Sequence, residues 1–204
     1  MRRSRAHSRS LLRQGYSLLE LLLVLAVIVT ASAMAVPQLM DRLASGRVQD
    51  GADAVREVLA GARRFAIEAG VDYHFRYEMN GTSFVAIPAD PLNRPASSYT
   101  ADEESSVTNV VVQSGELEAG LTLSPFREDS SVTESLEAEA FLDLPDAGTL
   151  AGKTWSLPIL FRFDGTAEDH RFRLLDEEGR SAEIRVRGLT GAAWVSQVFR
   201  MEED

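Results

Sequence analysis

The sequence contains no cysteine and few histidines, and its longest apolar run holds a single charged residue. The absence of cysteine from all 204 residues means that the chain forms no disulfide and offers no thiolate ligand to a metal. Of its three histidines, His74 and His170 lie outside the first 15 residues, and neither has a second donor of its kind at metal-ligand spacing. A G-x-S-x-G nucleophile elbow and an EF-hand loop are also missing. These absences disfavour an enzyme and predict neither a cofactor nor a metal site.

The charge is acidic overall and unevenly distributed. The net charge is −10, yet residues 1–15 carry five arginines and no acid. Without those five, the 21 basic residues fall to 16 against 31 acidic residues, so the remainder has a net charge of −15. An acidic body does not favour binding to a phosphate backbone, which requires clustered Lys and Arg. Nucleic acid is therefore an unlikely partner.

The long apolar run extends from Leu18 to Val36, and Glu20 is its only charged residue. As a helix it is about 28 Å long, close to the thickness of a bilayer core. The arginine-rich flank before it is expected to stay in the cytoplasm, so the chain after it faces outward. Two simple interpretations are a plain membrane anchor and a cleaved signal peptide. The signal peptide would end at a small-residue site, Ala31-Ser32-Ala33 or Ala33-Met34-Ala35.

Glu20 argues against both simple interpretations. An acid inside a membrane helix costs about 2.5–3.5 kcal/mol on insertion scales, so a partner that offsets this cost is expected. Cleavage after Gly15 would give Tyr16 a new α-amino group, and such groups are mostly protonated at neutral pH because their reference pKa is near 8. In an array of identical helices, Glu20 of one subunit would meet the Tyr16 ammonium of its neighbour. That pair would also fix the axial stagger between subunits.

The residues Gly15-Tyr16-Ser17-Leu18-Leu19-Glu20, followed by the apolar run, resemble the prepilin cleavage and methylation signature of type IV pilins and type II secretion pseudopilins. The resemblance implies a prepilin peptidase that cuts after Gly15 and N-methylates Tyr16, and an assembly role for Glu20. It also implies a helix kink at Pro37. Tyr16 departs from the phenylalanine that is usual in the family, although it keeps a bulky aromatic side chain.

Helical periodicity continues beyond Pro37. Apolar residues recur at steps of four and three, which is one stripe of an amphipathic helix, at Val48, Ala52, Val55, Leu59, Ala62 and Ala66. The opposite face is predicted to be solvated, and it carries Arg47, Asp50, Arg56, Arg63 and Arg64. Gly70 is a natural stop signal. This second half of the helix is expected to pack on a globular domain.

The rest of the chain alternates like β-strands. A half-buried strand from Val71 to Met79 is followed by Asn80-Gly81, a strong hairpin signal, and a return strand from Ser83 to Ile87. Further strands are predicted at 107–113, 121–123, 158–163, 171–175, 182–187 and 195–199, with turns at Asp164-Gly165 and Glu178-Gly179. The predicted fold class is α+β, a long N-terminal helix packed on an antiparallel β-sheet domain, as in pilins.

The stretch from Ile159 to Val195 resembles the minor pseudopilin H family (GspH/FimT). The resemblance rests on the strand into Asp164-Gly165-Thr166, the two strands after it, and Leu189-Thr190-Gly191. Ala192 stands where the family often has an arginine, so no role of that arginine is carried over. Residues 89–156 match nothing in the family.

Two further stretches have features of a ligand-binding motif, but a simpler structural role is expected for each. Residues 147–154, AGTLAGKT, fit a relaxed phosphate-loop pattern, but the flanking strand and helix that the motif requires are not predicted, so a surface loop is expected. Asp164 and Asp169 could hold calcium with loop carbonyls, but aspartates in turns are far commoner. His74 lies on the polar phase of its strand and is expected at the surface.

The sequence therefore predicts a minor pseudopilin of a type II secretion system, a structural subunit that crosses the bacterial inner membrane once and carries a periplasmic domain. Its expected partners are the prepilin peptidase, other pseudopilins or pilins through the helix, and secretion-system components. The alternatives are a type IV pilus minor pilin involved in pilus assembly or DNA uptake, and an exported hydrolase whose mature chain begins after Ala35. The predicted divisions are a leader at 1–15, a transmembrane helix at 16–36, an amphipathic helix at 37–70, and a domain at 71–204 with loop insertions at about 89–106 and 127–156.

Overall fold

The computed structural model describes residues 16–90, 111–126, 132–136, 138–141, 144 and 146–201. The chain divides into two compact units, the first ending at Leu43 and the second beginning at Ala44. One helix, α1 (Leu18–Ala69), supplies residues to both units. The leader and the predicted cleavage position at Gly15 lie outside the described residues.

The second half of α1 packs through the predicted apolar stripe. All six stripe residues are fully buried: Val48, Ala52, Val55, Leu59, Ala62 and Ala66. Phe65 widens the buried face, since it is also almost completely covered. The helix ends at Ala69, and Gly70 has φ +68°, a left-handed conformation that glycine adopts without steric cost. The predicted stop is therefore confirmed, and the helix ends where the chain must turn into the first strand.

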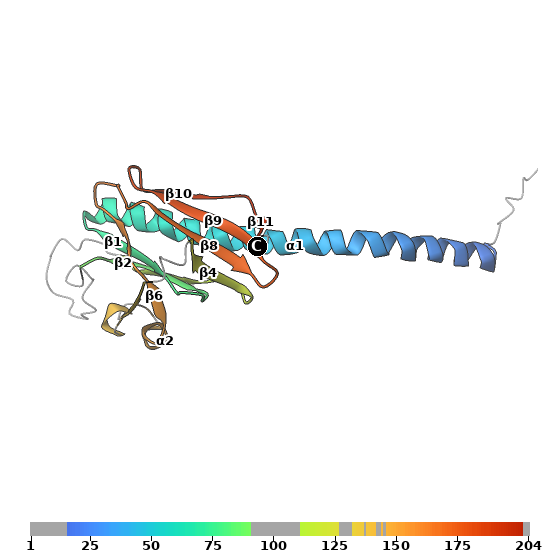
Figure 1. The fold of residues 1–204 in the computed structure, drawn as a ribbon, viewed down its shortest axis with the longest axis horizontal. Coiled ribbons are helices and arrows are strands. Elements are labelled where there is room, and N and C mark those ends of the chain that lie inside the picture. Colours follow the sequence, from blue (N-terminus) through green and yellow to red (C-terminus); the bar gives the residue numbers. More distant parts are fainter. Residues whose placement is uncertain are drawn as a thin grey trace, which may run out of the picture. The chain divides into compact units, whose positions relative to one another are not determined.

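Among the described residues, the strands form two larger sheets and one small two-stranded sheet (Figure 1). Every pairing between these strands is antiparallel. The first sheet has the order β3-β2-β1-β7, with β1 (Tyr73–Tyr77), β2 (Ser83–Pro88), β3 (Gln113–Glu116) and β7 (Ile159–Phe161). The second sheet has the order β10-β9-β8-β4, with β11 also beside β9. Its strands are β4 (Leu121–Pro125), β8 (His170–Asp176), β9 (Arg180–Arg187), β10 (Ala192–Val195) and β11 (Phe199–Arg200). The α+β class is confirmed.

Both sheets contribute to one core around the α1 stripe. Aromatic residues of β1 meet residues of β8: the Tyr77 and Phe172 rings stack with centroids 4.7 Å apart, and Phe75 also packs on Phe172. Inward positions of β9, including Ile184 and Val186, are fully buried in the same cluster. The large apolar side chains alternate along these strands because every second one is buried against the helix. This confirms the predicted packing of the helix on a β domain.

The predicted turns are confirmed at three places. Asn80, between β1 and β2, has φ +53°, a conformation that asparagine tolerates better than most residues. Gly165 and Gly179 have φ +85° and +77°, and they stand in the turns before and after β8. Asn80 and Gly179 lie in the hairpins β1–β2 and β8–β9, whereas the turn at Gly165 leads from β7 in the first sheet to β8 in the second.

The stretch predicted as a loop insertion at 127–156 contains regular structure in its described part. It holds β5 (Thr133–Ser135), the 3-10 helix η3 (Ala138–Phe141), α2 (Ala147–Ala151) and β6 (Thr154–Ser156), and β5 pairs with β6. Its apolar side chains form a second cluster, the outer cluster, with members Phe141, Leu144, Leu150 and Trp155 packed on Val85 and Ile87 of β2. The expected surface loop at 147–154 is therefore wrong, because Leu150 and Trp155 are buried against the outer side of the first sheet.

Three further predictions differ from the structure in detail. The strand expected at 107–113 is β3, which begins at Gln113, and residues 107–110 lie outside the described residues. In place of the closing strand expected at 195–199 there are two short strands: β10 ends at Val195, β11 begins at Phe199, and residues 196–198 lie outside both. His74 is half-buried rather than exposed, because β1 is a central strand and its neighbours place Ile87 and Leu160 beside the imidazole.

Candidate functional site

The start of α1 has a defined cap. Ser17 precedes the helix, and its Oγ accepts the backbone N–H of Glu20 at 3.1 Å. Its carbonyl accepts the N–H of Leu21 at 3.2 Å, the first hydrogen bond of the helix. Ser17 and Glu20 therefore stand at the N-cap and third helical positions, the arrangement of a capping box. The charge of Glu20 alone did not predict this cap, whereas the S-x-x-E spacing of Ser17 and Glu20 is a sequence signal for it.

The Glu20 carboxylate has no ion-pair partner in the part of the chain that the structure describes. It is exposed within a surface of leucines, as is Tyr16, of which 78% is accessible. A carboxylate in such a surface requires compensation when the surface is buried.

The helix after Glu20 is apolar on all sides. Its best 18-residue window has mean hydropathy 2.5, and none of that window is buried within the chain. Large side chains stay exposed around the helix, and they include Leu18, Leu19, Leu21, Leu22, Leu23, Val24, Leu25, Val27, Ile28, Val29, Val36, Leu39, Met40 and Leu43. A helix that is apolar all round requires lipid or other helices around it. By length and composition this one can cross a membrane.

The hydroxyl group of Thr30, in this segment, is satisfied within the helix. Thr30 Oγ1 donates to the carbonyl oxygens of Ala26 and Val27, at 3.0 and 2.9 Å. This internal bonding suits an apolar surrounding, where no water is present to accept the hydroxyl proton. Helical backbone also continues through Pro37, so the predicted kink at that residue stays a prediction.

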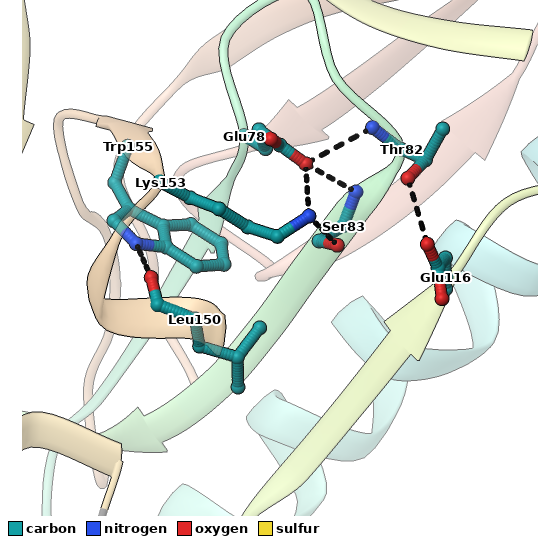
Figure 2. Close-up of polar contacts among 7 residues, drawn as sticks. All are labelled: Glu78, Thr82, Ser83, Glu116, Leu150, Lys153 and Trp155. Carbon is teal, nitrogen blue, oxygen red and sulfur yellow. Dashed lines mark hydrogen bonds and ion pairs between the residues drawn. The ribbon is translucent and has the colours of Figure 1, made fainter. Parts of the chain in front are cut away.

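The lysine of the phosphate-loop pattern is engaged by other protein groups (Figure 2). Lys153 Nζ lies 2.8 Å from Glu78 Oε2 and 2.8 Å from Ser83 Oγ. The Glu78 carboxylate also accepts the backbone N–H groups of Thr82 and Ser83, each at 3.2 Å. Burial acts to raise the pKa of Glu78, but Lys153 and the two N–H donors outweigh it, so the net pKa is lowered. This lysine holds the insertion on the first sheet.

The two aspartates weighed as calcium ligands support turns. Asp164 Oδ1 accepts the backbone N–H and the hydroxyl of Thr166, at 2.9 and 2.7 Å. Asp169 Oδ1 accepts the N–H of Gly188 at 3.0 Å. Among the described residues, no group of three His, Cys, Asp or Glu side chains is placed to hold a metal. Both aspartates therefore act as structural turn residues here.

The two turns that carry the second resemblance meet against α1. Arg63 Nε donates to the carbonyl of Gly165 at 3.1 Å, and the side chain is half-buried. The prediction that Arg63 lies on a solvated face is therefore wrong. A Cβ on Gly191 would lie 2.5 Å from that same carbonyl oxygen, so a side chain at this position would collide with backbone. Gly191 also has φ +58°. The glycine is required both by conformation and by close approach.

The chain was compared with known proteins. No family model matches the sequence. No curated protein matches it either. Among solved structures, it is similar to the minor pseudopilin EpsH from the type 2 secretion system of Vibrio cholerae, at 11% sequence identity and a TM-score of 0.44. That alignment covers 74% of this chain and 97% of EpsH.

Proposed function

We propose that this chain is a minor pseudopilin of a type II secretion system, a structural subunit and not an enzyme. A prepilin peptidase removes residues 1–15 and N-methylates Tyr16. The mature protein crosses the inner membrane once and carries its β domain in the periplasm. The observation that supports this most strongly is the apolar helix, which begins within three residues of the Gly15-Tyr16 bond and leaves Glu20 without an ion-pair partner in the described residues.

Assembly follows from the chemistry of the helix start. Cleavage exposes a cationic amine at Tyr16, one helical turn before Glu20, and a neighbouring subunit shifted along the helix axis brings that amine to Glu20. The ion pair offsets a desolvation cost of about 2.5–3.5 kcal/mol for the acid. Apolar side chains around the rest of the helix pack against those of adjacent subunits. The α1 stripe from Val48 to Ala66 is already buried in the β domain, so it is not available for this packing.

The N-terminus of the mature protein tests the proposal. The full chain is expressed in a host that has a prepilin peptidase, and the purified protein is analysed by N-terminal sequencing and mass spectrometry. We expect the chain to begin with N-methylated Tyr16. A chain that keeps Met1 would overturn the proposal in favour of a plain anchor, and one that begins at Met34 or Val36 would overturn it in favour of a cleaved signal peptide.

Two matched variants make the result specific. Gly15→Leu places a large side chain at the cleavage position, and we expect the unprocessed chain to accumulate. Ala33→Leu changes the small-residue site of the signal-peptide alternative, and we expect processing at Tyr16 to continue unchanged. The opposite pattern would support a signal peptide.

A further inference from the structure

The outer side of the second sheet carries an arginine cluster. Residues of β8 and β9 alternate, and the inward positions are buried in the main core: Phe172, Leu174, Ala182, Ile184 and Val186. The intervening outward positions hold Arg171, Arg173, Arg185 and Arg187, with Glu183 as the one acid among them. We call these four arginines the arginine face. This face is positively charged, whereas the protein as a whole carries a net negative charge.

The register places like charges directly opposite each other. Arg171 on β8 is the cross-strand neighbour of Arg185 on β9, and Arg173 is opposite Glu183. Side chains directly opposite in an antiparallel pair lie about 4.5–5.5 Å apart at Cβ, where two like charges destabilise the sheet. The arrangement is unfavourable unless an anion lies between the two guanidinium groups.

Among the described residues, Glu183 is the one acid that forms an ion pair with these arginines. Arg171 Nε is 3.7 Å from Glu183 Oε1, a long contact between partly exposed groups. Arg173 contacts the sulfur of Met201 at 3.4 Å, and its buried Nε has no hydrogen-bond acceptor among the described residues. Within that same part of the chain, Arg185 and Arg187 form no ion pair, and both are exposed. Counted over the described residues, the four arginines and Glu183 leave three positive charges in excess.

Aromatic rings hold several of these guanidinium groups in place. Arg187 lies over the Trp194 ring at 4.9 Å from its centroid, and Arg173 lies over Phe126 at 4.3 Å. Arg171 lies at 5.7 Å from the same Phe126 ring. Cation–π contacts of this kind limit the conformational freedom of long side chains before a ligand arrives. The face is therefore preorganised for an anionic partner.

We propose that the arginine face binds an extended acidic segment of a partner protein, with acids at alternate positions. Arg185 and Arg187 are two residues apart on one strand, about 6.6–6.8 Å along its axis. Carboxylates at alternate positions of an extended segment have the same spacing and lie on one side of it. Bidentate contacts between guanidinium and carboxylate groups then neutralise the repulsion between Arg171 and Arg185.

Net charge favours a short acidic segment over a nucleic acid. Beyond the five leader arginines, 16 basic residues face 31 acidic residues, so a long polyanion would meet repulsion outside the arginine face. A segment with a few carboxylates contacts the arginine face alone. This inference depends on the sheet and its register, and it holds whether or not the N-terminus is processed as proposed above.

The test uses the full chain in micelles of an uncharged detergent and a fluorescein-labelled peptide of five Glu-Ser repeats. A peptide of five Gln-Ser repeats is the uncharged control, and binding is followed by fluorescence anisotropy. We expect the acidic peptide to bind and the neutral one not to bind. Arg185→Gln with Arg187→Gln should weaken binding about tenfold, because each removes one exposed charge contact. The matched pair Arg56→Gln with Arg64→Gln, on α1, should leave binding unchanged.

Other outcomes would overturn the proposal. Equal binding of the acidic peptide to the protein and to the Arg185/Arg187 variant would place the contact elsewhere. Tighter, salt-sensitive binding of a twelve-residue thymidine oligonucleotide would assign the arginine face to nucleic acid. Absence of binding to either probe would also reject it. An unchanged thermal unfolding midpoint in the Arg185/Arg187 variant shows that any loss is not a loss of folding.

Discussion

Ser17 Oγ accepts the N–H of Glu20 at 3.1 Å, so the acid of the apolar helix stands at the third position of a capped helix start. This gives Glu20 two possible contributions. Its carboxylate can complete the capping box, a role that glutamine also performs. Its charge can pair with the Tyr16 amine of a neighbouring subunit, a role that glutamine cannot perform. The two contributions are separable by substitution.

Substitutions at Glu20 are expected to block assembly while sparing processing. Glu20→Ala removes both contributions, and Glu20→Gln keeps the capping ability but removes the charge. If charge pairing sets the subunit stagger, both variants should be cleaved after Gly15 yet be absent from sheared filaments. N-terminal sequencing measures processing, and immunoblotting of the filament fraction measures assembly.

Ser17→Ala is the control for the cap. Loss of an N-cap serine costs about 1 kcal/mol of helix stability, and the charge of Glu20 stays in place. We expect this variant to assemble. Normal incorporation of Glu20→Gln would contradict the charge-pairing mechanism and leave capping as the role of Glu20.

Two glycines of α1 should respond differently to alanine. A Cβ on Gly46 meets nothing within 4 Å, so Gly46→Ala should raise the free energy of unfolding by about 0.8–1.0 kcal/mol through helix propensity. A Cβ on Gly51 would lie 2.9 Å from Leu121 Cδ1 and 3.2 Å from Leu174 Cδ1. Overpacking costs about 1–3 kcal/mol, which cancels or exceeds the propensity gain at Gly51. Urea unfolding followed by tryptophan fluorescence measures the free energy of unfolding of each variant. If alanine at Gly51 raised it as much as alanine at Gly46, the close packing around Gly51 would be contradicted.

Lys153→Met should destabilise the protein in a pH-dependent manner. It leaves the Glu78 carboxylate with its two backbone donors but without its cation, at an expected cost of about 1–3 kcal/mol at neutral pH. The lowered pKa of Glu78 means that its stabilisation is present above about pH 4.5 and is lost as the pH falls further. The difference between the parent and the variant should therefore narrow below pH 4.5.

A matched variant at an exposed pair controls for the change of charge. Arg64 contacts Glu68 at 3.9 Å, and both side chains are more than half exposed, so Arg64→Met should change stability by less than about 0.5 kcal/mol. Chemical unfolding at several pH values measures both variants. A Lys153→Met effect as small as that of Arg64→Met would show that the contact with Glu78 contributes little.

Stability should also decline between pH 7 and pH 5 because of His170. Burial lowers the pKa of His170 below its ordinary value of 6.5, and the charge of Glu168 opposes this in part. The unfolded chain then binds a proton that the folded protein does not, so stability falls as the pH drops below 6.5. In His170→Gln this part of the pH dependence should disappear. An identical slope in the parent and the variant would contradict the prediction.

The sequence predicted correctly those helices and turns that depend on residues close together in the chain. The α1 stripe follows a helical period, so Val48 and Leu59 were assigned to the core correctly, and Asn80 and Gly165 marked turns by their conformational preferences. The cap at Ser17 was also readable but was overlooked. Processing at Gly15 and Tyr16 stays a prediction.

Long-range pairing explains what was missed. Phe141, Leu144 and Trp155 have no common period, and their burial depends on the outer side of β2, which comes far earlier in the chain. Arg171 and Arg185 are a different case, because they belong to one local hairpin around Glu178-Gly179. The dipeptide indicated the turn, but only the register of β8 and β9 places the two arginines opposite each other.

The strand β2 faces a different cluster on each side: Phe84 and Ala86 turn to the core around α1, whereas Val85 and Ile87 turn to the outer cluster. Packing in the segment from β5 to β6 and packing around α1 can therefore change separately, because each uses a different side of this strand. Replacement of Val85 and Ile87 by polar residues would disturb the outer cluster and leave the side chains that face α1 in place.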